Sequence, residues 1–248
     1  MSPIRPPLQA NALKIEGAQV AARPNGLLLV DKPAGVTSHD VVQLVRRVYG
    51  ERSIGHLGTL DPFATGLLLL LLGHSTRLAT FIVTEPKVYE ATIRFGMETD
   101  TDDFTGSPIR QAEVPGFDVI LAAIPSLTGC ISQVPPAYSA KSVDGTRAYD
   151  AARQGVHLDL APVEVTVNDW VVLAERVDEL DVRITCGTGT YVRGLARDLG
   201  RAAGTAAHLS SLRRMRCGVF DVADAATVEH MKASAPPLMT LSVVASSV

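Results

Sequence analysis

One loop of this sequence has the residue types of a catalytic site. It places a single aspartate, Asp61, in a turn rich in glycine and proline, and it reads Gly58-Thr59-Leu60-Asp61-Pro62-Phe63-Ala64-Thr65-Gly66. A carboxylate can act as a nucleophile or stabilise positive charge that develops on a substrate. An aspartate before a proline is more often a turn cap, so the role of Asp61 depends on its neighbours.

The segments around this loop predict rigid elements that would hold it in place. The pair Thr37 and Asp40 resembles a capping box and predicts a helix that Gly50 ends. Alternating apolar residues around Tyr89 predict a half-buried strand with this tyrosine on its apolar face. The other expected elements are a strand at 26–30, a buried strand or helix segment at 67–72, a helix at 119–127, turns or a hairpin within 133–155, strands at 163–173 and 182–186, and a helix capped by Thr190 that runs to about residue 203. Strands and helices are mixed without a βαβ rhythm, which favours an α+β fold with an antiparallel or mixed sheet.

The average charge of the chain does not indicate a nucleic-acid-binding protein. The 248 residues include 23 Lys and Arg against 26 Asp and Glu, a formal net charge of −3. A surface for RNA must then be a local patch. One candidate contains seven arginines and a single acid, Asp198, and consists of Arg183, Arg193, Arg197, Arg201, Arg213, Arg214 and Arg216. Within it we interpret Arg197 and Arg201 as a solvated face or as phosphate contacts.

The sequence suggests no metal site, cofactor or membrane segment. Cys130, Cys186 and Cys217 are widely spaced without a Cys-x-x-Cys pair, which points away from a disulfide framework or zinc and towards a reducing cytoplasm. The acidic stretch at 98–103 lacks the spacing of an EF-hand loop. The longest apolar run, 67–72, is far shorter than the roughly 20 residues of a membrane helix.

Six motifs in order along residues 25–220 resemble those of the TruB family, the tRNA pseudouridine-55 synthases. The loop described above, taken from Gly55 to Leu68, closely resembles the active-site motif of that family. The other five motifs are Asp31–Ser38; Lys87–Tyr89 with Gly96 and Thr99–Asp102; Gln133–Ala140 with Gly145–Tyr149; Gly189–Arg193; and His208–Arg214.

The resemblance implies a fold and a set of site residues. The fold would be that of the pseudouridine synthases, with a central mixed, largely antiparallel sheet, flanking helices and a thumb-like insertion at about 133–155. Asp61 would be the essential aspartate and Arg193 its partner in the pocket. The further roles implied are uracil stacking by Tyr89, lining of the pocket around the flipped base by Tyr191 and Leu212, packing against the distorted T loop by His56, and a position near the pocket for Lys32.

The same resemblance implies how the chain is organised and what it binds. Residues 1–24 would be a loosely ordered extension, 25–220 the catalytic domain, and 221–248 a short tail without the complete PUA domain that relatives usually carry. The protein would act as a cytoplasmic monomer on the T arm of tRNA, without a cofactor, a metal or a protein partner. The target base would have to be extruded from folded RNA, at a cost of a few kcal/mol that stacking offsets.

The implied reaction converts the T-loop uridine at position 55 to pseudouridine. Breaking the bond between uracil N1 and ribose C1′ resembles glycoside cleavage, although a delocalised uracil anion needs no second carboxyl to protonate it. Asp61 would either attack C1′ or assist loss of the C2′ proton, and the sequence leaves both routes open. A pocket that excludes water would raise the pKa of such a carboxyl, and a permanently charged guanidinium such as that of Arg193 opposes this effect.

Three other functions stay open at this point. The chain could be a related synthase that acts on another RNA, such as a guide-dependent modifier of rRNA. It could be an RNA chaperone that folds tRNA and whose catalysis is secondary. A nucleoside hydrolase is a third alternative, and this class would release free uracil and be expected to have a metal or a second acid.

Overall fold

The computed structural model describes residues 23–139, 142–143, 146–148, 156 and 158–240. Its strands are β1 (Gly26–Lys32), β2 (Ile54–Leu57), β3 (Thr65–Leu72), β4 (Lys87–Phe95), β5 (Met97–Thr99), β6 (Pro108–Gln111), β7 (Gly129–Gln133), β8 (Ser142–Val143), β9 (Thr146–Arg147), β10 (Val163–Arg176), β11 (Glu179–Cys186), β12 (Ala207–Cys217), β13 (Phe220–Asp221) and β14 (Ala226–Thr227). Its α-helices are α1 (Ser38–Tyr49), α2 (Phe117–Ala123), α4 (Val192–Ala202) and α5 (Val228–Ala233), with 3₁₀ turns η1 (Gly73–Phe81), η2 (Ile124–Leu127) and η3 (Val222–Asp224).

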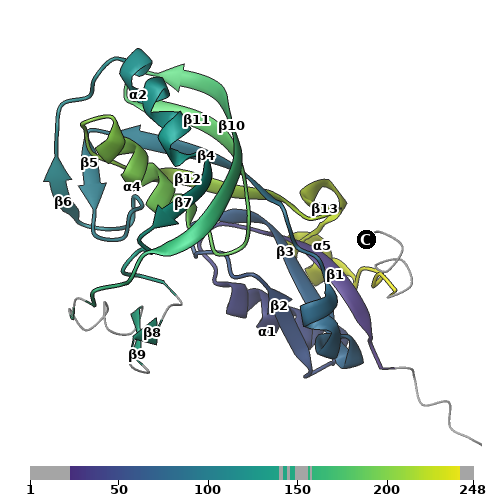
Figure 1. Cartoon of the computed structure of the whole chain (residues 1–248). Helices are drawn as coiled ribbons and strands as arrows, with labels where there is room; N and C mark the ends of the chain where they lie inside the picture. Colours follow the sequence, from purple (N-terminus) through teal and green to yellow (C-terminus); the bar gives the residue numbers. More distant parts are fainter. Residues whose placement is uncertain (1–22, 140–141, 144–145, 149–155, 157, 241–248) are drawn as a thin grey trace, which may run out of the picture.

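Ten of the strands form one mixed sheet (Figure 1). Its order is β14-β1-β3-β12-β4-β11-β10-β7, with β2 paired to β3 and β13 paired to β12. The pairs β1–β14 and β3–β12 are parallel, whereas the others in this sheet are antiparallel. The pairs β5–β6 and β8–β9 form two small separate sheets. The predicted α+β class with a mixed, largely antiparallel sheet and flanking helices is therefore confirmed.

The leucine run at 67–72 forms strand β3, which resolves the choice between strand and helix. Its residues are almost completely buried on both faces of the sheet. Leu68, Leu70 and Leu72 belong to the core that α1 and α4 cover, while the alternate leucines pack in a second core with Cys217 and Phe220. A strand covered on both faces needs no polar alternation, because neither face meets water.

Local sequence signals predicted one helix start correctly and missed another. The capping box of Thr37 and Asp40 is present at the start of α1, and Gly50 ends this helix with a left-handed conformation. The prediction that Thr190 caps the next long helix is wrong. The N-cap of α4 is Tyr191, and its side chain makes no capping hydrogen bond. The helix expected at 119–127 is divided into α2 and η2, because Pro125 cannot donate the amide hydrogen bond that an α-helix requires.

The segment after Phe220, expected to be a tail, packs against the sheet as far as residue 240. It contains η3, β14 and α5, and β14 pairs with β1. Further along, Met239 forms an antiparallel bridge with Leu27. Of the expected thumb, residues 133–139, 142–143 and 146–148 are described and include the β8–β9 pair, whereas the expected extension at 1–24 lies almost wholly outside the described residues. None of the described helices has the length and apolar character needed to cross a membrane.

The part of the sheet formed by β14, β1 and β3 meets the part formed by β12, β4, β11, β10 and β7 at the start of β3. β3 and β12 pair in parallel through two residue pairs, Arg213 with Thr65 and Arg214 with Gly66. Gly66 has a φ of +100°, and a Cβ atom on it would lie 2.3 Å from the backbone oxygen of Arg214. Only glycine permits this close approach, and the loop that carries Asp61 leads directly into it.

Replacing Gly66 with alanine is expected to lower the free energy of unfolding by about 2 kcal/mol or more, because a left-handed φ and a backbone clash act together. Gly35→Ala is the matched control, since Gly35 has a φ of +83° but a Cβ atom added to it would meet no non-neighbouring atom within 4 Å. Urea unfolding of both variants measures the difference. Equal losses would show that the close approach to β12 contributes nothing.

Candidate active site

Asp61 and Arg193 form a bidentate ion pair. The Nε atom of Arg193 lies 2.8 Å from Oδ2 of Asp61, and Nη2 lies 3.2 Å from Oδ1. The arginine side chain is 4% exposed, whereas that of the aspartate is 35% exposed. Both carboxylate oxygens are thus held by a buried cation while part of the group still faces outward, as a reactive carboxylate requires.

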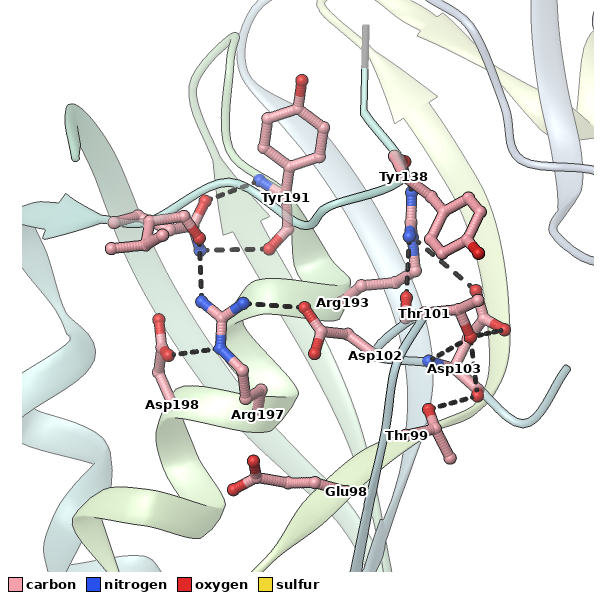
Figure 2. Close-up of polar contacts among 12 residues, drawn as sticks. Glu98, Thr99, Thr101, Asp102, Asp103, Tyr138, Tyr191, Arg193, Arg197 and Asp198 are labelled. Atoms are coloured by element: carbon pink, nitrogen blue, oxygen red, sulfur yellow. Dashed lines mark hydrogen bonds and ion pairs between the residues drawn. The ribbon is translucent and has the colours of Figure 1, made fainter. Parts of the chain in front are cut away.

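Arg193 also connects three segments that are distant in sequence. Its Nη1 donates to the carbonyl of Thr101 at 2.8 Å, and its Nη2 donates to the carbonyl of Tyr138 at 2.8 Å. The carboxylate of Asp103 lies 3.8 Å from its Nε. Figure 2 shows these groups around the guanidinium. Arg193 is thereby fixed in the orientation in which it meets Asp61.

The loop that carries Asp61 is attached to two other elements near Leu60 and Pro62. The Ser38 hydroxyl at the start of α1 accepts from the Leu60 amide at 3.0 Å and donates to the Leu60 carbonyl at 3.1 Å. The Gly35 amide and the Lys32 ammonium both donate to the Pro62 carbonyl, at 2.8 and 3.3 Å. Residues on both sides of Asp61 are therefore held by groups from β1, from the turn after it and from α1.

A third attachment comes from β12. Arg214 is 1% exposed, and its Nη2 donates to the Gly58 carbonyl at 3.0 Å, while its Nε donates to the Leu67 carbonyl at 2.7 Å. This arginine spans the loop from its first residue to the strand that follows it. We infer that Arg214 sets the path of the loop.

Lys32 is completely buried and binds three carbonyl oxygens. Besides Pro62, its ammonium donates to Val36 at 2.7 Å and to Pro33 at 2.9 Å. Burial lowers the pKa of Lys32 to about 8, against the opposing attraction of Asp61. The lysine is therefore still charged at neutral pH and close to losing its proton in mild alkali.

We expect the rate of the wild-type reaction to fall as the pH rises above about 8, because neutral Lys32 holds the Pro62 carbonyl more weakly. The same rise in pH changes the contribution of Lys32 to the free energy of unfolding in the opposite direction. Between about 8 and the unfolded value of 10.5 the unfolded chain binds more protons, so the contribution of Lys32 to stability rises with pH. A loss of rate in that range without a loss of the folded state is the expected signature.

Lys32→Met should be about tenfold slower than wild type at about pH 7, since hydrogen bonds from a charged donor are lost, and it should lack the alkaline decline. Lys32→Arg keeps its charge and should move the decline to higher pH. Single-turnover rates across the pH range measure both. If Lys32→Met kept the decline in rate at alkaline pH, that decline would arise from the titration of another group.

Tyr89 and Leu212 lie on one face of neighbouring strands. β4 and β12 pair Tyr89 with Arg214 and Ala91 with Leu212, and all four residues are buried. Burial raises the pKa of the Tyr89 phenol to about 12, while the Arg214 guanidinium opposes the shift. Tyr89 is thus a neutral ring of which 8% is exposed, and its stacking on a base stays a prediction.

Tyr191 is the N-cap of α4, and His56 lies on β2. The Tyr191 amide donates to the Gln133 side chain at 2.9 Å, and the Gln133 amide group donates to the Tyr191 carbonyl at 3.1 Å. This exchange ties the end of β7, where the thumb begins, to the start of α4. His56 lies half-buried on β2, where burial lowers the pKa of its imidazole and the nearby Arg214 adds to the shift.

The basic patch expected from the arginine cluster does not form a free cationic surface. Six of its seven members pair with carboxylates, in the pairs Arg183–Glu90, Arg193–Asp61, Arg197–Asp102, Arg201–Glu98, Arg213–Asp31 and Arg216–Asp221. The seventh, Arg214, is buried against backbone carbonyls. Five of these acids lie far from the cluster in sequence, so a local count of charges missed them.

The interpretation of Arg197 as a solvated or phosphate-binding residue is wrong. Its side chain is 9% exposed, and it contacts Asp102 at 2.7 Å and Asp198 at 2.9 Å. It also donates to the Val134 carbonyl at 2.8 Å. Burial raises the pKa of Asp102 to about 6, with Arg197 opposing the shift, and this aspartate has a φ of 60°. Arg197 and Asp102 thus form a second layer of the site next to Arg193 (Figure 2).

The acidic stretch at 98–103 supplies partners for the arginines of α4. Glu98 binds Arg201 and Arg110, Asp102 binds Arg197, and Asp103 lies near Arg193. Within the described part of the chain, no group of three or more histidines, cysteines or acids is arranged to hold a metal. The roles of Asp103 and Arg214 were not predicted. The excess of arginine at 183–216 does not show whether its partners are remote acids or phosphate, and no sequence feature indicates that Arg214 is buried.

This sheet, with a loop aspartate held by a helix arginine, defines a pseudouridine synthase fold. A solved structure of a Cbf5-Nop10-Gar1 complex matches with a TM-score of 0.64 and 28% identity over 82% of this chain and 52% of that chain. The structure of an H/ACA RNP bound to a substrate RNA containing 2′-deoxyuridine matches with a TM-score of 0.61 and 27% identity, over 82% and 51%. This chain thus spans about half the length of those two chains.

Family models and curated relatives are more specific. The model "TruB family pseudouridylate synthase (N terminal domain)" matches residues 46–192, and "tRNA pseudouridylate synthase B C-terminal domain" matches residues 193–236. The tRNA pseudouridine synthase B of Thermobifida fusca is 47% identical over 84% of this chain and 75% of the relative. That of Leifsonia xyli is 49% identical over 86% and 74%. The chain belongs to the TruB family.

Proposed function

We propose that this protein isomerises the T-loop uridine at position 55 of tRNA to pseudouridine, with Asp61 as the reactive carboxylate. The observation that carries the proposal is the bidentate Asp61–Arg193 pair, set in the loop that matches the TruB motif. Relatives at 47% and 49% identity are named tRNA pseudouridine synthase B, which supports tRNA as the substrate.

The geometry suits either route by which the glycosidic bond could break. In the first, an Asp61 oxygen attacks C1′ while the N1–C1′ electron pair leaves with the uracil. In the second, the carboxylate takes the C2′ proton as the same bond breaks. In both routes the uracil then turns so that C5 faces C1′. In the first route C5 displaces the Asp61 oxygen from C1′, and in the second the carboxylate returns the proton to C2′ as C5 joins C1′. The C5 proton is then lost and N1 gains a proton, so the product is an isomer of the substrate.

Each remaining site residue has a proposed role in this chemistry. Arg193 orients Asp61 and balances its charge through the bidentate pair. Lys32 holds the loop next to Asp61 through the Pro62 carbonyl. We propose that Tyr89 stacks on the uracil, that Tyr191 and Leu212 complete the walls around it, and that His56 contacts the T loop from β2.

The test is to incubate the protein with unmodified tRNA transcripts and to map pseudouridine at single-nucleotide resolution. Conversion at position 55 of the T loop is the expected result. Modification of rRNA but not of tRNA would instead support a related synthase with another target. We further propose that the protein acts as a monomer in the cytoplasm on the T arm, without a protein partner. Sedimentation of the protein–tRNA complex can check that one copy of the protein binds one tRNA.

A further inference from the structure

Arg197 lies one helical turn after Arg193 on α4 and joins two segments that are distant in sequence. Its Nη1 contacts the Asp102 carboxylate at 2.7 Å, and its Nη2 donates to the Val134 carbonyl at 2.8 Å. Its Nε meets Asp198 of α4 itself at 2.9 Å. Arg197 therefore connects the acidic turn at 98–103 to the start of the thumb.

The same two segments hold the arginine of the active site. Arg193 donates to the Thr101 carbonyl in the acidic turn and to the Tyr138 carbonyl in the thumb, each at 2.8 Å. These bonds orient the guanidinium that meets Asp61. A shift of either segment would therefore move the donors that bind Asp61. Arg197 can fix both segments from one side chain without contacting the reacting group.

The start of the thumb is packed closely against α4. Gln133 is completely buried, and its side chain exchanges two hydrogen bonds with the Tyr191 backbone. A Cβ atom added to Gly194 would lie 3.0 Å from Nε2 of Gln133. Val134, the next residue of the thumb, is held through its carbonyl by Arg197. A change at Arg197 would therefore affect the first residues of the thumb directly.

Asp102 has an uncommon backbone conformation. Its φ of 60° lies in the left-handed region, and among the described residues other than glycine it alone has a positive φ. Its amide donates to the Thr99 carbonyl at 3.2 Å, and its carbonyl accepts from the Leu209 amide at 3.0 Å. Such conformations persist where the surroundings fix them, often at functional sites. In this conformation the carboxylate meets Arg197 (Figure 2).

We propose that Arg197 and Asp102 form a positioning pair, which holds the thumb and the acidic turn in the arrangement in which Arg193 orients Asp61. This role rests on the proposed function, since the orientation of Asp61 matters only if Asp61 reacts. The pair acts through the carbonyls that bind Arg193. A small displacement of a reacting group can remove a large part of the rate, so loss of the pair should slow the chemical step more than it weakens binding.

The pair depends on the ionised form of Asp102. Burial raises the pKa of Asp102 to about 6, and Asp198 adds to the shift, whereas Arg197, Arg193 and Arg201 oppose it. The other titratable groups on this turn or next to it are Glu98, Asp100, Asp103, Arg110 and His208. The rate of the wild-type reaction should therefore fall as the pH decreases through about 6.

The same titration changes stability in the opposite direction. Between the unfolded value of 3.8 and about 6 the native chain binds more protons, so the contribution of Asp102 to the free energy of unfolding falls as the pH rises. A pair needed only for folding would give a rate that follows this contribution. A positioning role predicts that the rate rises while the contribution falls.

Asp102→Asn removes the charge and keeps a residue type that tolerates the left-handed conformation. At about pH 7 its single-turnover rate on saturating unmodified tRNA should be about tenfold below wild type, with a Kd within about twofold. It should show no decline of its own as the pH falls through about 6. Urea unfolding of the same samples should show no loss of stability, because the ionised carboxylate is the form that burial disfavours.

Arg197→Met removes the other member of the pair together with the donor to Val134. Hydrogen exchange of the peptide that covers 133–139 should become about tenfold faster, the usual effect of losing one hydrogen bond to a charged group. Unchanged exchange in this variant, with the folded state verified by circular dichroism, would show that the pair does not hold the thumb and would overturn the proposal.

Asp198→Asn is the matched control, because Asp198 binds Arg197 from the same helix. Its rate at neutral pH should equal that of wild type, and its decline in acid should move to lower pH, since the repulsion of Asp102 by Asp198 is removed.

The proposal is overturned if Asp102→Asn reacts like wild type or keeps the decline in acid. A loss of rate matched by a loss of folded protein would also overturn it, because the pair would then be only structural. If wild type forms no pseudouridine, the proposed function fails. Hydrogen exchange at 133–139 in Arg197→Met then still decides whether the pair holds the thumb.

Discussion

Replacing Asp61 with asparagine is expected to abolish pseudouridine formation while tRNA binding is retained. The change keeps the size of the side chain and removes the negative charge, so neither attack on C1′ nor removal of the C2′ proton remains available. Losing the central residue of a catalytic group lowers kcat by about 10⁴-fold or more. Pseudouridine mapping and a gel-shift titration on one tRNA measure the two quantities.

Asp169→Asn is the matched control, because it makes the same chemical change at an exposed position on β10. It should leave the rate and the affinity unchanged. The Asp61 variant also separates the rival functions. A chaperone whose catalysis is secondary would still refold tRNA at the wild-type rate in Asp61→Asn. Residual isomerisation within about tenfold of wild type would remove Asp61 from the chemistry altogether.

The sequence predicted those parts of the structure that depend on local contacts. The capping box of α1 joins residues three apart, and the alternation in β4 needs only one buried face. Both signals are decided by neighbours in the chain, and both are confirmed. The class of sheet also follows from the order of the elements, because a parallel sheet needs the repeated βαβ crossovers that this order lacks.

The electrostatics of the site could not be predicted in the same way. Arg193 and Asp61 are 132 residues apart, and Arg197 meets Asp102 across 95 residues. Family resemblance suggested the Arg193–Asp61 pair, whereas the local pattern around Arg197 was interpreted as a solvated face. A run of arginines gives the same local pattern whether it meets phosphate or remote carboxylates. Only the fold decides between these, by placing the acidic stretch at 98–103 against α4.

The leucine run shows a related limit. Its periodicity was compatible with a strand or a helix because six consecutive leucines carry no alternation. The choice depends on what covers both faces, namely α1 and α4 on one side and the second core with Phe220 on the other. The C-terminal segment supplies part of that second cover through Val222. Its packing therefore could not be predicted without the sheet.

The second large effect is expected from Arg193→Met. Removing this guanidinium leaves Asp61 without its cation and leaves Asp103 nearby as a second negative charge. It also leaves the carbonyls of Thr101 and Tyr138 without the donors that bind them here. Removing one partner of a fully buried pair costs roughly 3–5 kcal/mol of stability, and we expect a smaller loss here because the Asp61 side chain is 35% exposed. We expect kcat to fall about 100-fold or more in addition, because Asp61 is no longer held in its reactive orientation.

A purely structural role would predict a different pattern, so stability and rate must be measured on the same samples. Arg193→Lys keeps the charge but lacks the two parallel donors that meet the two oxygens of Asp61, and it should recover most of the stability and little of the rate. Arg201→Met, further along α4, is the control. Its side chain is 53% exposed and contacts Glu98, not Asp61, so the rate should change little, whereas some stability is lost because the buried Glu98 carboxylate keeps only Arg110. If Arg193→Lys recovered rate and stability together, the bidentate geometry would have no part in catalysis, and Arg193 would serve only to balance the charge of Asp61.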